Sequence, residues 1–528
     1  MADWSAHSGY NVANLVASEA LTRPDAPALR FESRSWTYAE LDEEAARAAN
    51  AFRALGVRAG DRIAILLPNI PAFVIAYLGT LRLGAIVVSV STAWPASDAA
   101  RAIADAAPRI VVLTTELHER LAIEDAAPDS ARRIVVRDGT QQMPSDVEDW
   151  EILLNRAVSR SPIQPVTEDA AAAILYTSGT SGEPKGVALS HRNVRSTAAA
   201  KVRYCGFHPL DGVALVLPLF HCYGQNAVLA ATFAAGGCVV LQRRFDAAAI
   251  VRGAQAGEIT ALPGVPLVFR RLLDLDDRAV TRAMRTLRYV FSAATTLPGQ
   301  LAESWRERMG HTIYEGYGLT ESSPFAAYNH HQLYVPGALG TPIEGVEMAI
   351  ADVESERLLK GSEVGEIVIR GPNVMLGYWR RPTETAQALR GGWLHTGDLG
   401  VRDKDGYYHL QDRMHDLVKV AGYRVFPSSV ELVLQSHPAV CESVAFGVSD
   451  PVHGELLEAA VVCAPGRRAS EHELLAHCQS RLARYQVPAR IHLRDELPRN
   501  TTGKVLRREL RDSRTSITTP RSPLPVQH

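Results

Sequence analysis

Two hydrophobic patterns run along the chain up to about Gly337 and predict alternating helices and strands. Residues 38–55 are rich in alanine, and their apolar positions recur every three or four residues, which is typical of an amphipathic helix. Short apolar runs, typical of buried strands, occupy residues 62–67, 109–114, 133–137, 170–176, 214–217, 238–241 and 289–292. The alternation predicts an α/β fold in which helices cover parallel sheets.

One apolar stretch, residues 71–90, is long enough to be considered as a membrane span. Arg82 lies near its middle, however, and Gly79 and Gly84 stand on either side of that charge. Pro71 suits the first turn of a helix, and the run 86–91 is typical of a strand. We therefore predict a buried helix followed by a strand, and no membrane span.

Beyond Gly337 the pattern changes, because glycine and proline become frequent and the apolar runs shorten. Short strands are expected at 346–350 and 366–370, and Asp405-Gly406 marks a hairpin turn. This part should be mainly antiparallel β-structure, followed by an α+β segment. The expected domains are a large one over 1–411, β-rich from about 337, a small one over 412–512, and a disordered tail over 513–528.

The charge balance, the N-terminus and the cysteine spacing each bear on the kind of protein that is expected. The 56 Lys and Arg nearly balance the 58 Asp and Glu, which argues against a nucleic-acid binder with a basic stripe. The N-terminus lacks the basic start and apolar run of a signal peptide, so a cytoplasmic location is expected. No two cysteines form a CxxC pair, and reduced thiols are expected at Cys205, Cys222, Cys238, Cys441, Cys463 and Cys478.

The strongest chemical signal is YTSGTSGEPKG, residues 176–186, directly after the apolar run AAAIL. A loop rich in Ser, Thr and Gly after a buried strand offers N–H groups and hydroxyls to phosphate oxygens, and Lys185 adds a positive charge. Pro184 before this lysine and Gly186 after it exclude the Walker A pattern. We predict a phosphate-binding loop of another kind.

The loop resembles the phosphate-loop signature of the adenylate-forming superfamily, which includes acyl- and aryl-CoA synthetases, luciferase-type enzymes and peptide-synthetase adenylation domains. Motifs similar to that family's follow in order: YGLTE (317–321), GEI (365–367), GYW (377–379), WLHTGD (393–398), DR (412–413), KVAGY (419–423) and PRNTTGK (498–504). The resemblance covers nearly all of residues 15–510 and is to the acyl-CoA synthetase type. It implies a large domain of α/β subdomains with a β-rich subdomain, and a small mobile α+β C-terminal domain.

The resemblance implies attack of a carboxylate on the α-phosphate of ATP, with release of pyrophosphate and formation of acyl-AMP. A carboxylate is already ionised at neutral pH, so the reaction needs charge neutralisation at phosphorus rather than a general base. Glu321 is implied to hold Mg²⁺, and Thr320 to lie beside the α-phosphate. Nucleotide-binding roles are implied for Thr177, Ser178, Gly179, Thr180, Ser181, Gly182, Lys185, Ser292, Ala293, Ala294, Glu315, Gly316, Tyr317, Gly318, Asp398 and Arg413, the last two at the ribose.

The same resemblance implies a second half-reaction, in which a thiol attacks the acyl-adenylate after the small domain rotates about a hinge at Asp412. Lys419 and Gly422, in KVAGY, then line the path of the CoA pantetheine. Lys504, in PRNTTGK, is implied to be the catalytic lysine that reaches the α-phosphate and the substrate carboxylate. A solvated lysine near the chain end is the alternative interpretation.

Four segments are implied to line the acid pocket: 220–226, 262–268, 291–296 and 322–325. His221 stands where amino-acid-activating relatives carry an aspartate, which disfavours an α-amino acid as substrate. The segments contain no Lys or Arg, which disfavours a dicarboxylic acid. His221 is a candidate for a catalytic role at the carboxylate or the thiol, with a packed histidine as the alternative.

We therefore hypothesise an ATP- and Mg²⁺-dependent ligase that activates a medium- or long-chain fatty acid and transfers it to CoA. An aryl acid–CoA ligase is an alternative. Another is an acyl-AMP ligase that loads the phosphopantetheine of a separate carrier protein. A non-catalytic acyl or nucleotide sensor is less favoured, because Lys185, Glu321, Asp398, Arg413 and Lys504 are all present.

Overall fold

The computed structural model describes residues 9–122, 131–138, 143–144, 147–178, 184–275, 278–420, 423–450, 454–464, 466–499 and 505–512. The chain divides into two compact units. The large unit comprises Met1–Ala349 and Val368–Thr396, and the small unit comprises Ile350–Ile367 and Gly397–His528. The predicted domain boundary at residue 412 stays a prediction, and the predicted tail, 513–528, lies outside the described residues.

One sheet of the large unit is parallel over most of its width. Its strands are β3 (Arg62–Leu66), β4 (Ile86–Ser89), β5 (Ile110–Thr114), β6 (Arg132–Val136), β7 (Glu148–Asp149), β8 (Ala171–Ser178), β9 (Pro184–Ser190) and β19 (Gly377–Tyr378). They lie in the order β19-β9-β8-β4-β3-β5-β6-β7, in which only β9 and β19 pair antiparallel among the described strands. The near-continuous apolar runs of this sheet are typical of parallel strands buried on both faces.

A second sheet of the large unit has a similar parallel centre with antiparallel edges. Its strands are β1 (Pro27–Phe31), β2 (Arg34–Thr37), β10 (Gly212–Leu215), β11 (Cys238–Leu241), β12 (Ala261–Gly264), β13 (Tyr289–Ser292), β14 (Tyr314–Tyr317), β15 (Ala327–Asn329) and β16 (Thr341–Pro342). The order is β16-β15-β14-β13-β12-β10-β11-β1-β2, and β2, β15 and β16 pair antiparallel. The predicted parallel α/β architecture is therefore confirmed.

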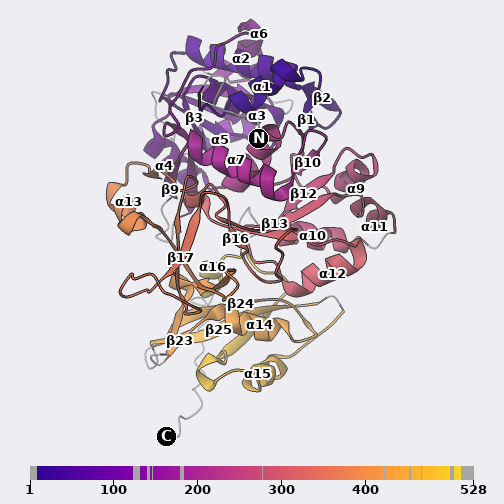
Figure 1. Cartoon of the computed structure of the whole chain (residues 1–528), viewed down its shortest axis with the longest axis vertical. Coiled ribbons are helices and arrows are strands. Elements are labelled where there is room, and N and C mark those ends of the chain that lie inside the picture. The colour runs from indigo at the N-terminus through magenta and orange to yellow at the C-terminus, as the bar shows by residue number, and fades with distance from the viewer. Residues whose placement is uncertain are drawn as a thin grey trace. The chain divides into compact units, whose positions relative to one another are not determined.

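Helices flank the two sheets of the large unit (Figure 1). The predicted helix 38–55 is α2, which starts after a capping box between Thr37 and Glu40. The helices of the large unit are α1 (Asn14–Thr22), α2 (Tyr38–Ala54), α3 (Pro71–Arg82), α4 (Ala96–Ala106), α5 (Thr115–Ala122), α6 (Trp150–Arg156), α7 (His191–Cys205), α8 (Ala231–Ala234), α9 (Ala247–Gln255), α10 (Pro266–Leu273), α11 (Arg278–Met284), α12 (Gly299–Met309) and α13 (Pro382–Ala388).

The stretch that resembled a membrane span is split as predicted. Helix α3 starts at Pro71 and ends at Arg82, and β4 follows it in the centre of the sheet. Arg82 is buried, where its guanidinium pairs with Asp42 of α2 at 2.5 Å. Within the described residues, no helix combines the length and apolar character that crossing a bilayer requires.

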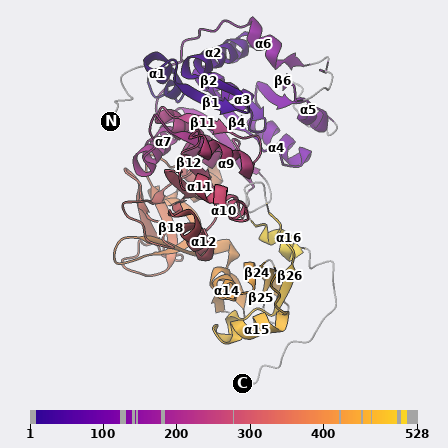
Figure 2. The same cartoon turned by 90° about the vertical axis from the view of Figure 1, so that its right-hand side faces the viewer.

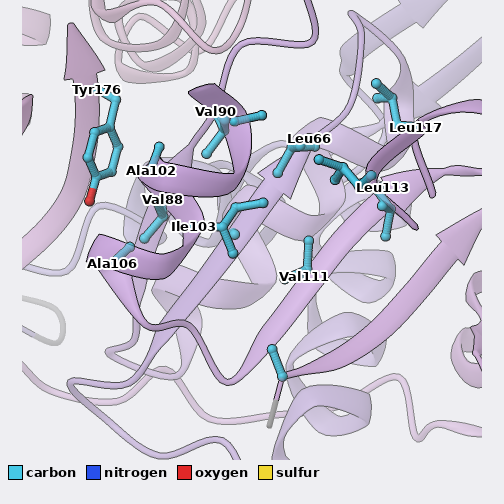
Figure 3. Packing of buried hydrophobic residues seen from close by; sticks show 14 of the residues in the cluster. Leu66, Val88, Val90, Ala102, Ile103, Ala106, Val111, Leu113, Leu117 and Tyr176 are labelled. Atoms are coloured by element: carbon cyan, nitrogen blue, oxygen red, sulfur yellow. The ribbon is translucent and has the colours of Figure 1, made fainter. Parts of the chain in front are cut away.

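The core beside the phosphate-loop motif is built from strands and from helices α4 and α5 (Figure 3). Helix α4 presents Ala102, Ile103 and Ala106 to the apolar side chains of β3, β4 and β5. Tyr176, the first residue of the motif, packs in the same cluster, and its hydroxyl donates a 2.6 Å hydrogen bond to Asp105 of α4. The core therefore fixes the strand that leads into the loop.

The small unit holds an antiparallel sheet with helices beside it (Figure 2). Its strands lie in the order β23 (Tyr423–Val425), β22 (Val418–Val420), β25 (Gly454–Cys463), β24 (Val440–Asp450), and β26 (Arg490–Arg494) pairs parallel with β25. Helices α14 (Pro427–Gln435) and α15 (Glu471–Gln479) pack on this sheet, and α16 (Arg507–Asp512) contacts β24. The α+β character expected of the C-terminal part is confirmed.

A further sheet has the strand order β17-β18-β20-β21, in which β20 and β21 pair antiparallel. The strands are β17 (Glu347–Ala351), β18 (Gly365–Arg370), β20 (Leu394–Arg402) and β21 (Tyr408–Arg413). The predicted hairpin at Asp405-Gly406 is the turn between β20 and β21, where Gly406 has a φ of 92°. Glycine adopts this left-handed conformation without steric cost.

Among the described residues no disulfide forms. Four of the thiols are buried and the remaining two are half-buried. This agrees with the expected reduced state.

Candidate active site

The phosphate-loop motif forms the end of the β8–β9 hairpin. Thr177 lies opposite Lys185 across the two strands, and Ser178 lies opposite Pro184. A strand follows this loop, whereas a helix follows a Walker A loop. Both ends of the loop are thus held by a sheet, with Lys185 at its base. Four predicted phosphate-binding residues lie outside the described residues: Gly179, Thr180, Ser181 and Gly182.

Tyr378 connects the base of this hairpin to the YGLTE motif. Strand β19 pairs with β9, which places Tyr378 beside Val187. The ammonium of Lys185 lies 5.6 Å from the centre of the Tyr378 ring, and the Tyr378 hydroxyl donates a 2.9 Å hydrogen bond to Oε1 of Glu321. Burial and the nearby Glu321 raise the pKa of Tyr378, so the phenol stays protonated and donates. A cation, a phenol and a carboxylate therefore meet at one place.

One group of the residues predicted to bind the nucleotide lies on, or just after, two adjacent parallel strands. Ser292 of β13 is the register partner of Glu315 on β14. Ala293 and Ala294 follow β13, and Ala294 adopts a left-handed φ of 73°. Burial raises the pKa of Glu315 to about 7, although the N–H of Leu297 that its carboxylate accepts acts in the opposite direction. The structure brings these predicted residues together.

The glycines of the same motif allow close approach of neighbouring groups. A Cβ at Gly316 would lie 2.5 Å from the ring of Phe291 and 2.8 Å from that of Phe325. A Cβ at Gly318 would collide with the carbonyl oxygen of Pro324. Tyr317, between the two glycines, is buried. Thr320 and Glu321 form a single 3₁₀ turn just beyond them.

The four segments predicted to line the acid pocket lie against one another. Tyr223 begins a π-helix (Tyr223–Ala230), and its hydroxyl donates to the carbonyls of Gly264 and Phe291, at 3.3 and 3.4 Å. Asn226, on the same helix, donates to the carbonyl of Ser323 at 3.5 Å. π-Helices are rare and often occur at functional sites. One short helix thus contacts the other three segments.

Aromatic rings fill the space where these segments meet. Tyr223 lies edge-to-face against Phe325 and Phe291, with ring centres 5.4 and 6.2 Å apart. Phe291 and Phe325 are 5.5 Å apart in the same manner, and Tyr328 lies 5.0 Å from Phe325. Such edge-to-face contacts stabilise a cluster beyond the gain from burial alone. The interior beside Gly316 is therefore apolar and aromatic.

His221 lies just before the π-helix and is half-buried. Burial lowers its pKa to about 4. The imidazole is therefore neutral at physiological pH and can donate and accept one hydrogen bond each, but it carries no charge to pair with a carboxylate. Its ring lies 5.0 Å from that of Phe220.

In the small unit, the two predicted ribose ligands are partners across the β20–β21 hairpin. Nε of Arg413 lies 3.1 Å from Oδ1 of Asp398, and the two residues are in register. Glu366, from the GEI motif, accepts the N–H of Gly397 at 2.9 Å. Asp398 is only 4% exposed, so the hairpin and Glu366 fix where this carboxylate lies.

Lys419 has an exposed side chain on β22, and its N–H donates to Glu455 at 2.8 Å. Gly422, the second residue predicted to line the CoA path, lies outside the described residues, as does the predicted catalytic Lys504. Their roles stay predictions.

Sequence analysis assigned no function to two residues that the structure places at this site. Tyr378 belongs to the GYW motif, and its hydrogen bond to Glu321 is apparent only in the structure. Lys201 of α7 is fully buried against the aromatic rings of the acid segments. The sequence does contain a pattern that indicates a buried position for this lysine. One buried face of α7 has the helical spacing Val194, Ala198, Lys201 and Cys205.

Two family models match the chain. The model described as AMP-binding enzyme matches residues 16–379, and the model described as AMP-binding enzyme C-terminal domain matches residues 429–504. The first alone covers more than half of the chain.

Known proteins match over nearly their whole length. A feruloyl-CoA synthase from Amycolatopsis sp. is 34% identical over 490 residues, which are 92% of this chain and 96% of that protein. A long-chain-fatty-acid–CoA ligase from Bacillus subtilis is 30% identical over 533 residues, 95% of this chain and 94% of that protein. The structure of ATP-bound MatB from Rhodopseudomonas palustris has a TM-score of 0.88 at 30% identity, covering 96% of this chain and 99% of that chain. The chain therefore belongs to the AMP-binding enzyme family, as an AMP-forming ligase that uses ATP to join a carboxylic acid to CoA.

Proposed function

We propose that the triphosphate of ATP binds at the base of the β8–β9 hairpin. The supporting observation is that Lys185 and Glu321 both contact Tyr378, so that a cation and a carboxylate flank one phenol. Phosphoryl-transfer sites combine a lysine with a metal-holding carboxylate in this way. Thr177 and Ser178, with Gly179, Thr180, Ser181 and Gly182, supply further donors to the phosphate oxygens.

Mg²⁺ fits this site through Glu321. Mg²⁺ is commonly held by one or two protein carboxylates together with substrate phosphates, rather than by a cage of protein ligands. When bound, the ion neutralises charge on the phosphate oxygens.

The nucleoside part of ATP is assigned to the remaining predicted residues. We place adenine at the turn Ser292-Ala293-Ala294 and the adjacent Glu315, Gly316, Tyr317 and Gly318. The register of Ser292 with Glu315 supports a single adenine site. The ribose hydroxyls are assigned to Asp398, whose carboxylate can accept both, with Arg413 holding its orientation through the 3.1 Å ion pair.

The chemical steps need few protein groups. The acid enters as a carboxylate and attacks the α-phosphate without a general base. Thr320 and Lys504 stabilise the negative charge that develops there, and the neutral His221 orients the carboxylate by hydrogen bonding. In the second half-reaction the CoA thiol, positioned by Lys419 and Gly422, attacks the acyl carbon and displaces AMP.

For the acid, our first candidate is a medium- or long-chain fatty acid. The four acid segments contain neither Lys nor Arg, and rings rather than polar groups fill the space between them. The B. subtilis relative named as a long-chain-fatty-acid–CoA ligase supports this candidate.

An aryl acid is a second candidate, which a specific observation favours. Tyr223, Phe291 and Phe325 are arranged edge-to-face, and a flat aromatic body can join such a cluster with similar contacts. The relative named as a feruloyl-CoA synthase agrees with it.

Pyrophosphate release tests these assignments when measured for fatty acids from butyrate to stearate and for benzoate, cinnamate and ferulate, each with and without CoA. We expect release with one class of acid, and acyl-CoA as the product by mass spectrometry. Glu321→Gln should suppress release for every acid, whereas Glu303→Gln, at an exposed position of α12, should not. Equal activity of the two variants would contradict the metal-holding role. Release without acyl-CoA would indicate a carrier-protein thiol instead.

A further inference from the structure

Lys201 is a buried lysine, and no carboxylate of the described residues pairs with its ammonium. It lies on α7, its side chain is fully buried, and among the described residues its Nζ has no hydrogen-bond partner. The thiol of Cys205, one turn further along the helix, is the polar group that interacts with it. Burial lowers the pKa of Lys201 to about 8, so the protonated form still predominates at pH 7. A buried ammonium of this kind is costly unless something pairs with it.

Aromatic rings surround the ammonium. Nζ lies 3.0 Å from the ring centre of Phe291, 5.1 Å from that of Tyr328 and 5.4 Å from that of Phe325. Tyr289 and Phe207 complete the enclosure at 5.8 and 5.9 Å. Ring faces attract a cation, which offsets part of the cost of burial. They do not replace the hydrogen bonds that three N–H donors make in water.

The enclosure of Lys201 shares two of its rings with the predicted acid pocket. Phe291 and Phe325 lie on two of the four acid segments, and Tyr223, on a third, contacts both. The backbone at Gly316 approaches the same two phenylalanines so closely that a Cβ there would not fit. Lys201 is therefore separated from the adenylate-binding strand β14 by a single layer of rings.

Two further polar groups in the enclosure are unsatisfied. The hydroxyls of Tyr289 and Tyr328 are buried, and within the described residues neither has a hydrogen-bond partner by distance and angle. The Cys205 thiol lies beside Tyr289 as well as Lys201. Buried polar groups normally find partners, so an unpaired ammonium and two unpaired hydroxyls together indicate a missing acceptor.

We infer that Lys201 is a specificity-determining residue, which recognises an acceptor oxygen at the end of the acid remote from the reacting carboxylate. The inference rests on the proposed function, because it concerns the acid of the same ligase reaction. The oxygen can be the second carboxylate of an aliphatic diacid or the phenolic oxygen of an aryl acid, since both accept from an ammonium. The acid reaches Lys201 once Phe291 or Phe325 changes rotamer, because the described structure encloses the ammonium completely and these two rings also face Gly316.

Lys201 bears on the expectation, drawn from the sequence, that a dicarboxylic acid is disfavoured as substrate. The four acid segments contain no basic residue, which disfavoured a second carboxylate on the substrate. The lysine comes instead from α7, outside all four segments. A purely apolar acyl chain would leave the ammonium unpaired, and sites built around a polar partner discriminate strongly against analogues that lack it. Lys201 therefore favours an oxygen-bearing aryl acid or an aliphatic diacid over the unsubstituted fatty acid that is our first candidate.

Two matched pairs of acids test the inference: octanoate against octanedioate, and cinnamate against 4-hydroxycinnamate. We expect wild-type kcat/KM to favour the oxygen-bearing member of one pair, which also identifies the source of the oxygen. Lys201→Met keeps the length of the side chain and should reduce that preference roughly 10- to 100-fold, the loss typical of a charged hydrogen bond. Lys360→Met, at an exposed lysine, should leave it unchanged.

Tyr328→Phe provides a second variant in case Lys201→Met fails to fold, because it removes one unsatisfied hydroxyl and keeps the ring. It should lower the same preference by a smaller factor. A uniform fall in kcat/KM for all four acids, with an unchanged preference, would show that Lys201 only supports the fold. If the wild-type protein preferred octanoate to octanedioate and cinnamate to 4-hydroxycinnamate, the inference would also be wrong, while the proposed ligase function would stand. No acid-dependent pyrophosphate release with any acid would contradict both.

Discussion

The hydroxyl of Tyr378 donates a 2.9 Å hydrogen bond to the carboxylate of Glu321. The phenol is held by the pairing of β19 with β9, and the N–H of Met375 donates to the Glu321 carbonyl at 2.9 Å. A carboxylate oriented in this way can hold a metal ion without first losing side-chain freedom. We therefore propose that Tyr378 is a positioning residue, which acts on the proposed Mg²⁺ site through Glu321.

Tyr378→Phe should raise the Mg²⁺ concentration needed for half-maximal pyrophosphate release about tenfold, with a smaller change in the rate at saturating Mg²⁺. The ring and its contact with Lys185 remain, while a hydrogen bond to a charged group, worth about 1.5–3 kcal/mol, is lost. A Mg²⁺ titration of activity measures this. Tyr485→Phe, in the small unit, is the control. An unchanged Mg²⁺ requirement would mean that Tyr378 only packs against the hairpin.

Asp398→Ala should weaken ATP binding more than acid binding, because the carboxylate is assigned to the ribose. Removing it also leaves Arg413 without its 3.1 Å partner. Calorimetric titration with ATP and with the acid, separately, measures the difference. Asp405→Ala, at the turn of the same hairpin, should bind both ligands normally. Unchanged ATP affinity in the Asp398 variant would exclude the ribose role.

Glu315 should make stability depend on pH. Burial raises its pKa to about 7, from the ordinary value of 4.5 that applies in the unfolded chain, so between these values the folded state retains a proton that the unfolded state has lost. The free energy of unfolding therefore falls as pH rises through this range.

Glu315→Gln should remove that fall, so the variant should gain stability relative to wild type mainly at pH 7 and above. Urea unfolding across this pH range tests the effect, with Glu303→Gln as an exposed control. Parallel pH profiles for wild type and the Glu315 variant would contradict it.

Local patterns in the sequence predicted much of the fold. Helix α2 was predictable because its apolar spacing and its Thr37–Glu40 cap lie within one segment. The contact between Tyr378 and Glu321 joins residues 57 positions apart, and no local pattern encodes it. Lys201 was missed for a related reason: its position on the buried face of α7 was readable, but the rings around it come from strands remote in sequence.

Asp412 makes contacts that bear on its predicted hinge role. Its carboxylate accepts the N–H of Arg413 at 2.8 Å and that of Ser428, in the first turn of α14, at 2.9 Å. A proline at this position would restrict φ to about −65° and remove a backbone donor. It would also remove both side-chain hydrogen bonds, so the two effects need separate variants.

Asp412→Pro should retain pyrophosphate exchange and lose acyl-CoA formation, because in the predicted scheme the small domain must rotate only for the second half-reaction. Asp412→Ala removes the same carboxylate but leaves the backbone free, and it should retain both reactions with reduced thermal stability. Measuring exchange and acyl-CoA production separately distinguishes these outcomes. Retention of both reactions in the proline variant would exclude a hinge at this residue.

Separate measurement of the two half-reactions in Lys504→Ala tests most directly whether this ligase first forms an acyl-adenylate with a lysine of the small unit and then transfers the acyl group. In single-turnover assays we expect pyrophosphate release to fall by about 10²–10³, the usual effect of losing one positioned donor. Thioester formation from supplied acyl-AMP should proceed at close to the wild-type rate, and Lys360→Ala should leave both steps unchanged. An equal fall in both half-reactions, in a variant that remains folded, would contradict the account.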